Sequence, residues 1–277
     1  MTSRTRCLLA VLLVGAVAGC GPTSNTTPDV SAAPTPTAVP APTATPTPSP
    51  TAAPTKSPSP AALPQGSEPV TLDPVRFNGV AKDNPFWPMK PCNRWVYRET
   101  DVDGTKQDVE VLVTERTKQI IGITATVVHD VVTEDGEVIE DTFDWYAQDV
   151  AGNLWYLGED TKEFENGKVV STEGSWLAGV NGAQPGVIMP ARPAVGMTYR
   201  QEYYAGQAED AAAVLSLDEH VTVPFGTFDG VLSTREVTAL EPDVAEQKFY
   251  ARGVGPIQVI QVSGGSSREE LITFEHR

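Results

Sequence analysis

The chain has 277 residues, with 36 Asp and Glu against 20 Lys and Arg, and a formal net charge of −16. Such an acidic protein repels phosphate groups, which argues against nucleic acid as a partner and against a domain lying flat on anionic lipid. Thirteen of its 24 prolines fall between Pro22 and Pro64, and every aromatic residue lies at or beyond Phe77. One folded domain in the C-terminal part is therefore expected.

The first nineteen residues have the layout of an export signal. Arg4 and Arg6 form a basic start, an apolar run follows, and Ala18 and Gly19 precede Cys20. The run is shorter than the about 20 apolar residues that a bilayer requires, so it predicts a signal peptide rather than a membrane helix. A cysteine at this place is typical of bacterial lipoproteins. We expect cleavage after residue 19 and acylation of Cys20, palmitate included, which anchors the chain on the outer side of the cell membrane.

Residues 20–68 alternate Pro with Thr, Ala and Ser, as in residues 33–36 and 46–50. Without aromatic residues this segment cannot bury enough apolar area to offset its chain entropy. It is predicted to be a disordered, extended linker, and residues 69–277 a β-rich globular domain. The Thr and Ser beside Pro are also typical of O-glycosylated stalks; a plain spacer is the alternative.

From residue 93 onward the pattern predicts hairpins. The first strands are expected at 95–99, 109–113, 119–132 and 138–147, separated by turns such as Asp135-Gly136. Later strands are expected at 198–204, 213–223, 230–237, 246–251, 257–262 and 269–274. Residues 209–217 alone have a composition that favours helix. About a dozen short strands predict a mainly β fold with little helix, a single antiparallel sheet that is strongly curved or partly closed into a barrel.

Catalytic motifs are missing from the sequence. His129, His220 and His276 form no i, i+4 pair, and neither a HExxH nor a Gly-x-Ser-x-Gly run occurs. With 36 carboxylates, choosing a glycosidase pair has no specificity. No catalytic residue and no cofactor are assigned.

Asp101, Asp103 and Asp108 are a weak candidate for a calcium loop, because Asp-x-Asp-Gly opens such loops. The loop also needs ligands at its fifth and twelfth positions, where Thr105 and Leu112 stand. A hairpin turn is the favoured interpretation, and no metal site is assigned.

Four aromatic residues are the candidate ligand-binding residues: Trp145, Tyr146, Trp155 and Tyr156. On neighbouring strands, alternation sends Trp145 to one face of the sheet and Tyr146 to the other. One face then either packs in the core, the more common arrangement, or presents rings to a ligand.

Several stretches resemble a family of uncharacterised secreted or lipid-anchored bacterial proteins, conserved lipoproteins of the actinobacterial type. They are residues 86–91, 93–97, 145–149, 155–160, 223–229 and 250–255. The resemblance covers 84–275 and implies a β-rich domain similar to the open half-barrels of lipoprotein carriers, with no catalytic residues. Cys92 stands where the resemblance leads us to expect Gly; we expect it to be a buried or partly buried inert thiol.

These features favour a non-catalytic, membrane-anchored extracytoplasmic lipoprotein. The domain would bind an apolar ligand, a glycan or another envelope protein. The alternatives are an extracytoplasmic hydrolase that acts on cell-wall material through Asp/Glu pairs, and a structural or assembly factor.

Overall fold

The computed structural model describes residues 63–77 and 84–276 of the chain. The predicted signal peptide, Cys20 and residues 20–62 of the predicted linker lie outside these ranges. Within the described ranges, no helix has the length and hydropathy that a membrane span requires.

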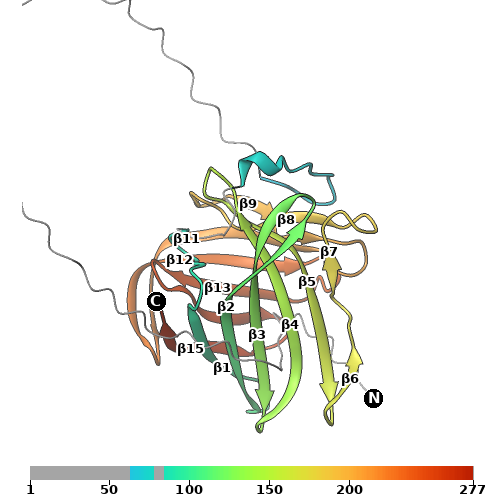
Figure 1. Cartoon of the computed structure of the whole chain (residues 1–277). Coiled ribbons are helices and arrows are strands. Elements are labelled where there is room, and N and C mark those ends of the chain that lie inside the picture. Colours follow the sequence, from blue (N-terminus) through green and yellow to red (C-terminus); the bar gives the residue numbers. More distant parts are fainter. Residues whose placement is uncertain (1–62, 78–83, 277) are drawn as a thin grey trace, which may run out of the picture. The chain divides into compact units, whose positions relative to one another are not determined.

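The described residues form one antiparallel sheet of 15 strands, preceded by a turn of 3-10 helix, η1 (Pro74–Arg76) (Figure 1). The strands of the first half are β1 (Arg94–Thr100), β2 (Lys106–Ile120), β3 (Ile123–Glu134), β4 (Glu137–Gln148), β5 (Leu154–Glu165), β6 (Lys168–Ser171) and β7 (Trp176–Leu177). Those of the second half are β8 (Gln184–Met189), β9 (Thr198–Arg200), β10 (Glu202–Tyr203), β11 (Asp210–Val223), β12 (Gly226–Thr238), β13 (Ala245–Ala251), β14 (Gly255–Ser263) and β15 (Arg268–Glu275).

The strands follow the order β10-β8-β5-β4-β3-β2-β1-β15-β14-β13-β12-β11-β9, with β6 and β7 paired to β5. In Figure 1, β2 to β5 run down one side of the sheet and β11 to β13 cross behind them. Strand twist and the register shifts in several pairs, such as the one between Val113 and Thr117, curve so long a sheet. The predicted fold class is confirmed, because the sheet is nearly closed into a barrel.

The apolar run 119–132, predicted as one strand, contains a hairpin turn. β2 continues to Ile120, and the chain reverses at Ile121 and Gly122, whose φ angles are 45° and 81°. Gly122 takes this left-handed conformation freely, but a β-branched residue such as Ile121 rarely does. The prediction was wrong here because Ile121 gives the turn the composition of a strand.

The segment 209–217, with its helix-forming composition, lies in a strand. Most of it belongs to β11, where Ala212 and Val214 are buried on one face. Pairing with β12 on one side and β9 on the other outweighs the helix propensity of alanine.

The two ends of the sheet are neighbours in the chain. Gln201 alone separates β9 from β10, and its N–H donates to the carbonyl of Asp210 on β11 at 2.8 Å. Strand β8 passes so close that a Cβ added at Gly186 would overlap the backbone of Gln201. The predicted strand 198–204 is therefore two short strands, which belong to opposite ends of the sheet.

Arg200, the last residue of β9, binds residues 66–68 to the place where β9 and β10 meet. The residue is 2% exposed, and its guanidinium donates to the carbonyls of Gly66, Glu68 and Pro185 at 2.7, 2.7 and 2.8 Å. Residues 63–68, predicted as the last part of the linker, thus lie against the β domain.

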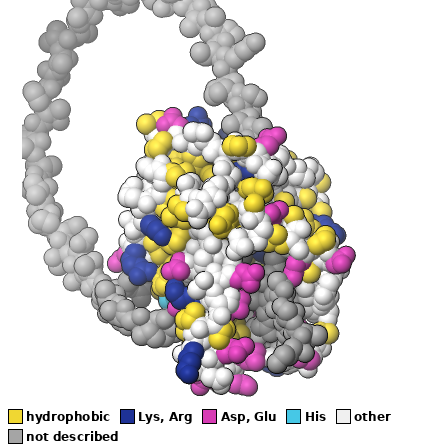
Figure 2. Space-filling model, turned by 90° about the vertical axis from the view of Figure 1, so that its right-hand side faces the viewer, with side chains coloured by type: hydrophobic (Ala, Val, Ile, Leu, Met, Phe, Trp, Pro, Cys, Tyr) yellow, Lys and Arg dark blue, Asp and Glu magenta, His cyan; other side chains and the backbone are white. Residues whose placement is uncertain are grey.

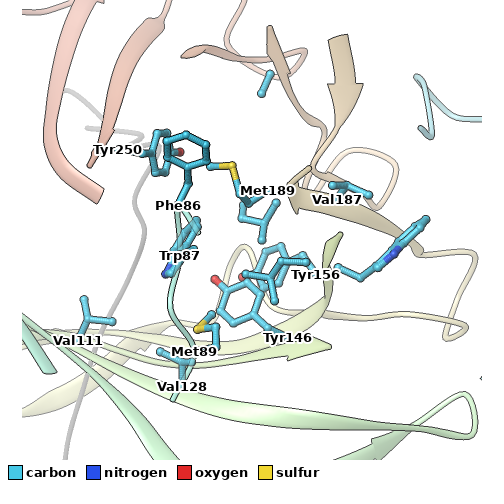
Figure 3. Packing of buried hydrophobic residues seen from close by; sticks show 14 of the residues in the cluster. Phe86, Trp87, Met89, Val111, Val128, Tyr146, Tyr156, Val187, Met189 and Tyr250 are labelled. Carbon is cyan, nitrogen blue, oxygen red and sulfur yellow. The ribbon is translucent and has the colours of Figure 1, made fainter. Parts of the chain in front are cut away.

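A segment without regular structure, residues 84–90, passes through the interior of the curved sheet. Figure 3 shows Trp87 between Tyr250 of β13 and Tyr146 of β4, and both ring centroids lie 5.9 Å from that of Trp87. Phe86 and Met89 beside it are 3% and 1% exposed. Through Trp87, this segment contacts β4 on one side of the sheet and β13 on the other.

The outer surface carries acidic side chains in plain view. On the face shown in Figure 2, Asp and Glu gather over the lower part, and apolar side chains lie mostly toward the top. The excess of acidic residues in the composition is thus visible on this face.

Candidate functional site

A cavity of about 180 Å³ lies inside the curved sheet. Strands β1, β2, β3, β13, β14 and β15 contribute to its walls, together with Trp87 of the interior segment. At about 30 Å³ for each water, its share of the liquid, this volume has room for roughly six waters. The cavity is therefore of the right size for a small organic molecule.

Alternation along the strands gives the cavity an aromatic deep end and an acidic outer end. Every second residue of a strand faces the same side, so Trp95, Tyr97 and Glu99 of β1 follow one another along the wall. Exposure rises in that order, since Trp95 is 1% and Tyr97 4% exposed while Glu99 is only partly buried. Glu269 of β15 lies directly opposite Glu99.

The polar atoms of three aromatic residues in the walls are already engaged by the protein. Trp95 Nε1 donates to the carbonyl of Val254 at 2.7 Å, and the Tyr97 hydroxyl donates to that of Pro256 at 3.1 Å. The Tyr250 hydroxyl donates to Glu236 at 2.9 Å. These residues therefore offer ring surface to the cavity rather than hydrogen-bond donors.

Carboxylic acids supply most of the polar lining. The acidic lining residues are Glu99, Asp101, Asp130, Glu241, Glu246 and Glu269. Among the described residues around this cavity, Lys248 is the one cationic side chain. Its Nζ lies 2.9 Å from Glu236 Oε2 and 3.8 Å from Glu246 Oε2, so its charge is already matched by two carboxylates.

The pKa values of two acids near Lys248, Glu236 and Glu269, are shifted in opposite directions. Burial would raise the pKa of Glu236, but the ion pair and hydrogen bond with Lys248 outweigh it and lower the pKa. Burial, with the charges of Glu99 and Glu246, raises the pKa of Glu269 to about 8 although Lys248 opposes the shift. Near neutral pH, Glu269 is therefore largely protonated in the ligand-free domain.

Asp130 is the most deeply placed acid of the cavity. It is 1% exposed, and its Oδ1 atom has no hydrogen-bond partner. Burial is the main cause that raises its pKa well above the usual value, and Asp144, Glu269 and Glu140 add to the shift. An unpaired buried acceptor is unusual, because most such atoms find a donor.

A second cavity of about 60 Å³ adjoins the first and shares Val244, Glu246 and Lys248 with it. Glu202 and Asp210 both line it and are hydrogen-bonded to each other, and Trp176 Nε1 donates to Glu202 Oε2 at 2.6 Å. Burial first, and the neighbouring acids next, raise the pKa of Glu202 well above its usual value. Two carboxyl groups in contact are closer than the about 5–9.5 Å of a glycosidase pair.

The four aromatic candidates, Trp145, Tyr146, Trp155 and Tyr156, are all buried. Trp145 is 6% exposed under Lys118, whose Nζ lies 3.0 Å from the ring centroid, and Trp155 packs edge-on against Phe77. Tyr146 and Tyr156 stack with centroids 4.8 Å apart. Of the four, Tyr156 lines a cavity, the smaller one.

The three aspartates of the weak calcium candidate have protein partners. Asp101 accepts from the N–H of Val102, Asp103 accepts from that of Thr105, and Asp108 is paired with Arg98 at 2.6 Å. In the described part of the chain, no group of three or more His, Cys, Asp or Glu is arranged to hold a metal ion. Asp101 instead contributes to the outer end of the larger cavity.

Cys92 occupies a left-handed backbone position with a φ of 69°, in the turn before β1. Its N–H donates to the carbonyl of Val113 at 2.8 Å. The residue is partly buried, as predicted. Glycine takes this conformation without strain, which gives a physical reason for the expected Gly.

The residues that sequence reasoning missed are Trp87, Asp130 and Glu269. Asp130 could have been found from the sequence, because it is an acidic residue between the valines of residues 127–132. An acidic residue in a buried strand is uncommon and indicates a special role. Trp87 and Glu269 had no such signal, since they belong to segments about 180 residues apart that meet only across the barrel.

No family model matches this chain, and neither does any curated protein. Two solved structures are similar to it. One is a "putative lipoprotein" from Parabacteroides distasonis, with 12% identity and a TM-score of 0.38; the other, from Bacteroides fragilis, is a "putative exported protein with YmcC-like fold", with 13% identity and a TM-score of 0.40. Each comparison covers 69% of this chain and 99% of the other. The family that the sequence motifs resemble stays a prediction.

Proposed function

We propose that this chain is an extracytoplasmic lipoprotein, held at the cell membrane by lipid on Cys20, whose β domain binds a small ligand inside its curved sheet. The cavity of about 180 Å³ is the observation that carries the proposal. Ligand sites are typically concave, with rings and polar groups directed inward, and both kinds of group line this cavity. The export-type N-terminus supports the location.

The predicted linker fits the same role. A proline-rich chain extends by about 3.1 Å for each residue, so some 45 residues reach on the order of 100 Å. A domain on such a tether can sample ligands or partners well away from the membrane surface.

The test is native mass spectrometry of the domain purified from its own host, with a variant that fills the cavity. Val259 lines the cavity on β14, whereas Val262 on the same strand is 46% exposed and does not line it. Val259→Phe should lose a co-purified or added ligand, and the control Val262→Phe should keep it. Wild-type protein that takes up nothing from a panel of amines, glycans and lipids would contradict the proposal.

A hydrolase of peptide bonds is the second candidate, because the carboxyl groups of Glu202 and Asp210 in the smaller cavity are hydrogen-bonded to each other, closer than in a glycosidase pair but as in aspartic proteases. Two carboxyl groups that share a proton can act as a general acid and base. Turnover of cell-wall fragments that is lost in Glu202→Gln would support this candidate. Equal turnover by the wild type and this variant would remove the pair from any such chemistry.

A further inference from the structure

The larger cavity has far more acidic than basic side chains, and this balance selects its ligand. Six acids line it, and Lys248, the single cation among the described lining residues, is held between Glu236 and Glu246. A ligand carboxylate or phosphate would have to enter this acidic field without an available positive partner. A positive charge on the ligand is the complement that the walls lack.

The hydrogen-bonding groups of the cavity point to the same kind of ligand. Trp95 Nε1 and the Tyr97 hydroxyl, both donors, are already used on backbone carbonyls, so neither is free for a hydroxyl-rich ligand. The remaining polar lining consists mainly of the six carboxyl groups, beside Gln107, Gln261 and Ser267, and Asp130 Oδ1 is buried and without a partner. A group with several N–H donors and no acceptor satisfies such walls best, and an ammonium group is of this kind.

The rings around the deep end favour a cation as well. Trp87, Trp95 and Tyr97 line the cavity together with Asp130. Aromatic faces attract an ammonium group through their quadrupole, most strongly where water is excluded. The same rings accommodate an apolar body of the ligand.

We propose that the cavity binds an organic primary ammonium compound, whose charged group is held by the acids Asp130 and Glu269 and whose apolar body packs against Trp87 and Trp95. This inference rests on the proposed ligand-binding function and names the chemical class of its ligand. It would give a function to the carboxyl group of Asp130 on β3, whose Oδ1 has no hydrogen-bond partner within the protein.

The ionisation of the acids is consistent with this assignment. Without a cation, burial and the neighbouring acids Asp144, Glu140 and Glu269 raise the pKa of Asp130, and Tyr97 is the titratable neighbour on β1. Ammonium binding would favour the charged carboxylate and expel its proton. Calorimetry in two buffers with different ionisation heats should therefore detect proton release on binding.

The experiment compares phenethylammonium with its neutral analogue 2-phenylethanol, by calorimetry and ligand-observed NMR on the whole domain. The ammonium compound should bind at least about tenfold more tightly, which is the effect of one charge-assisted hydrogen bond. Asp130→Asn should weaken its binding by a similar factor. Asp141→Asn is the matched control, because Asp141 is also a buried acid with an unpartnered Oδ1 but lines neither cavity.

Equal binding of the amine and the alcohol, or unchanged amine binding in Asp130→Asn, would overturn the inference. Circular dichroism confirms that each variant folds; if Asp130→Asn does not, Glu269→Gln at the outer end provides the second variant and should also weaken amine binding. Binding of glucose or octanoate without binding of the amine would overturn the ammonium assignment while the proposed ligand-binding function stands. Loss of all ligands in Val259→Phe, measured separately, tests that function.

Discussion

Asp130 and Glu269 sit where water solvates a carboxylate poorly, and both have raised pKa values as a result. Glu236 is also buried, but Lys248 lies 2.9 Å from it and Gln201 and Thr234 donate hydrogen bonds to it, and its pKa is lowered. The ammonium group of Lys248 is the largest of the causes that reverse the direction of this pKa shift. An ammonium ligand beside Asp130 would act there as Lys248 acts on Glu236.

The stability of the domain should fall as the pH rises from about 5 to 8. The pKa of Glu269 is about 8 in the folded state against 4.5 for a free side chain, so the folded state holds a proton that the unfolded chain has released. The free energy of unfolding then decreases with pH in this window. The titratable and charged groups that face Glu269 are Glu99, Glu246, Lys248, Asp130 and Tyr97.

Thermal unfolding of Glu269→Gln against the wild type at pH 5 and pH 8 measures this effect. The variant should have the smaller difference in Tm between the two pH values. Glu165→Gln, at an exposed position of β5, removes the same charge and should leave the wild-type dependence unchanged. A Glu269→Gln profile parallel to that of the wild type would contradict the assignment.

At the scale of elements, the closure of the sheet depends on two strands, β9 and β10, that are too short to show an alternation of polar and apolar residues. β9 and β10 have three and two residues, and their joint at Gln201 brings the two ends of the sheet together. Because Gly186 of β8 has no Cβ, the backbone of Gln201 can lie directly against it. A glycine inside a strand often marks such a close backbone approach.

Gly186→Ala should destabilise the domain by about 1–3 kcal/mol, the usual cost of an overpacked site, since the added methyl group meets the backbone of Gln201. Gly226→Ala is the control, because Gly226 also lies in a strand but a Cβ there makes only ordinary contact with Phe228. Denaturant unfolding measures both. Equal effects of the two substitutions would show that the approach at Gly186 can relax.

Strands bounded by clear turn signals could be predicted from the sequence. β1, β4 and β13 to β15 lie close to their predicted bounds, because the polar and glycine-containing turns around them are local signals. The turn at Ile121 was missed, since its residue type contradicts its conformation. Of the candidate site residues, Asp101 lines the larger cavity and Tyr156 the smaller one.

At the scale of the whole molecule, the proposal joins an anchor, a tether and a binding domain in one chain. The anchor depends on Cys20, and the chain offers an internal control in Cys92, which lies in the β domain. Acyl chains on the first residue of the mature protein would keep an otherwise acidic, water-exposed domain at the membrane.

Cys20→Ser should abolish incorporation of a clickable fatty-acid analogue and move the protein from the membrane fraction to the soluble fraction. Cys92→Ser should keep both the label and the membrane association. In-gel fluorescence of labelled cells measures the outcome. A wild-type protein that takes up no label would contradict the anchoring proposal.

The sequence by itself determined the β class of the domain and its curved, antiparallel character. Alternation and turn chemistry act between residues close in the chain, so they can be read without knowing which strands are neighbours in space. Only the tertiary structure decided that Trp87, Asp130, Lys248 and Glu269 surround one cavity. They meet because the barrel nearly closes, and the excess of acid over base at that place depends on strand pairings between distant parts of the chain.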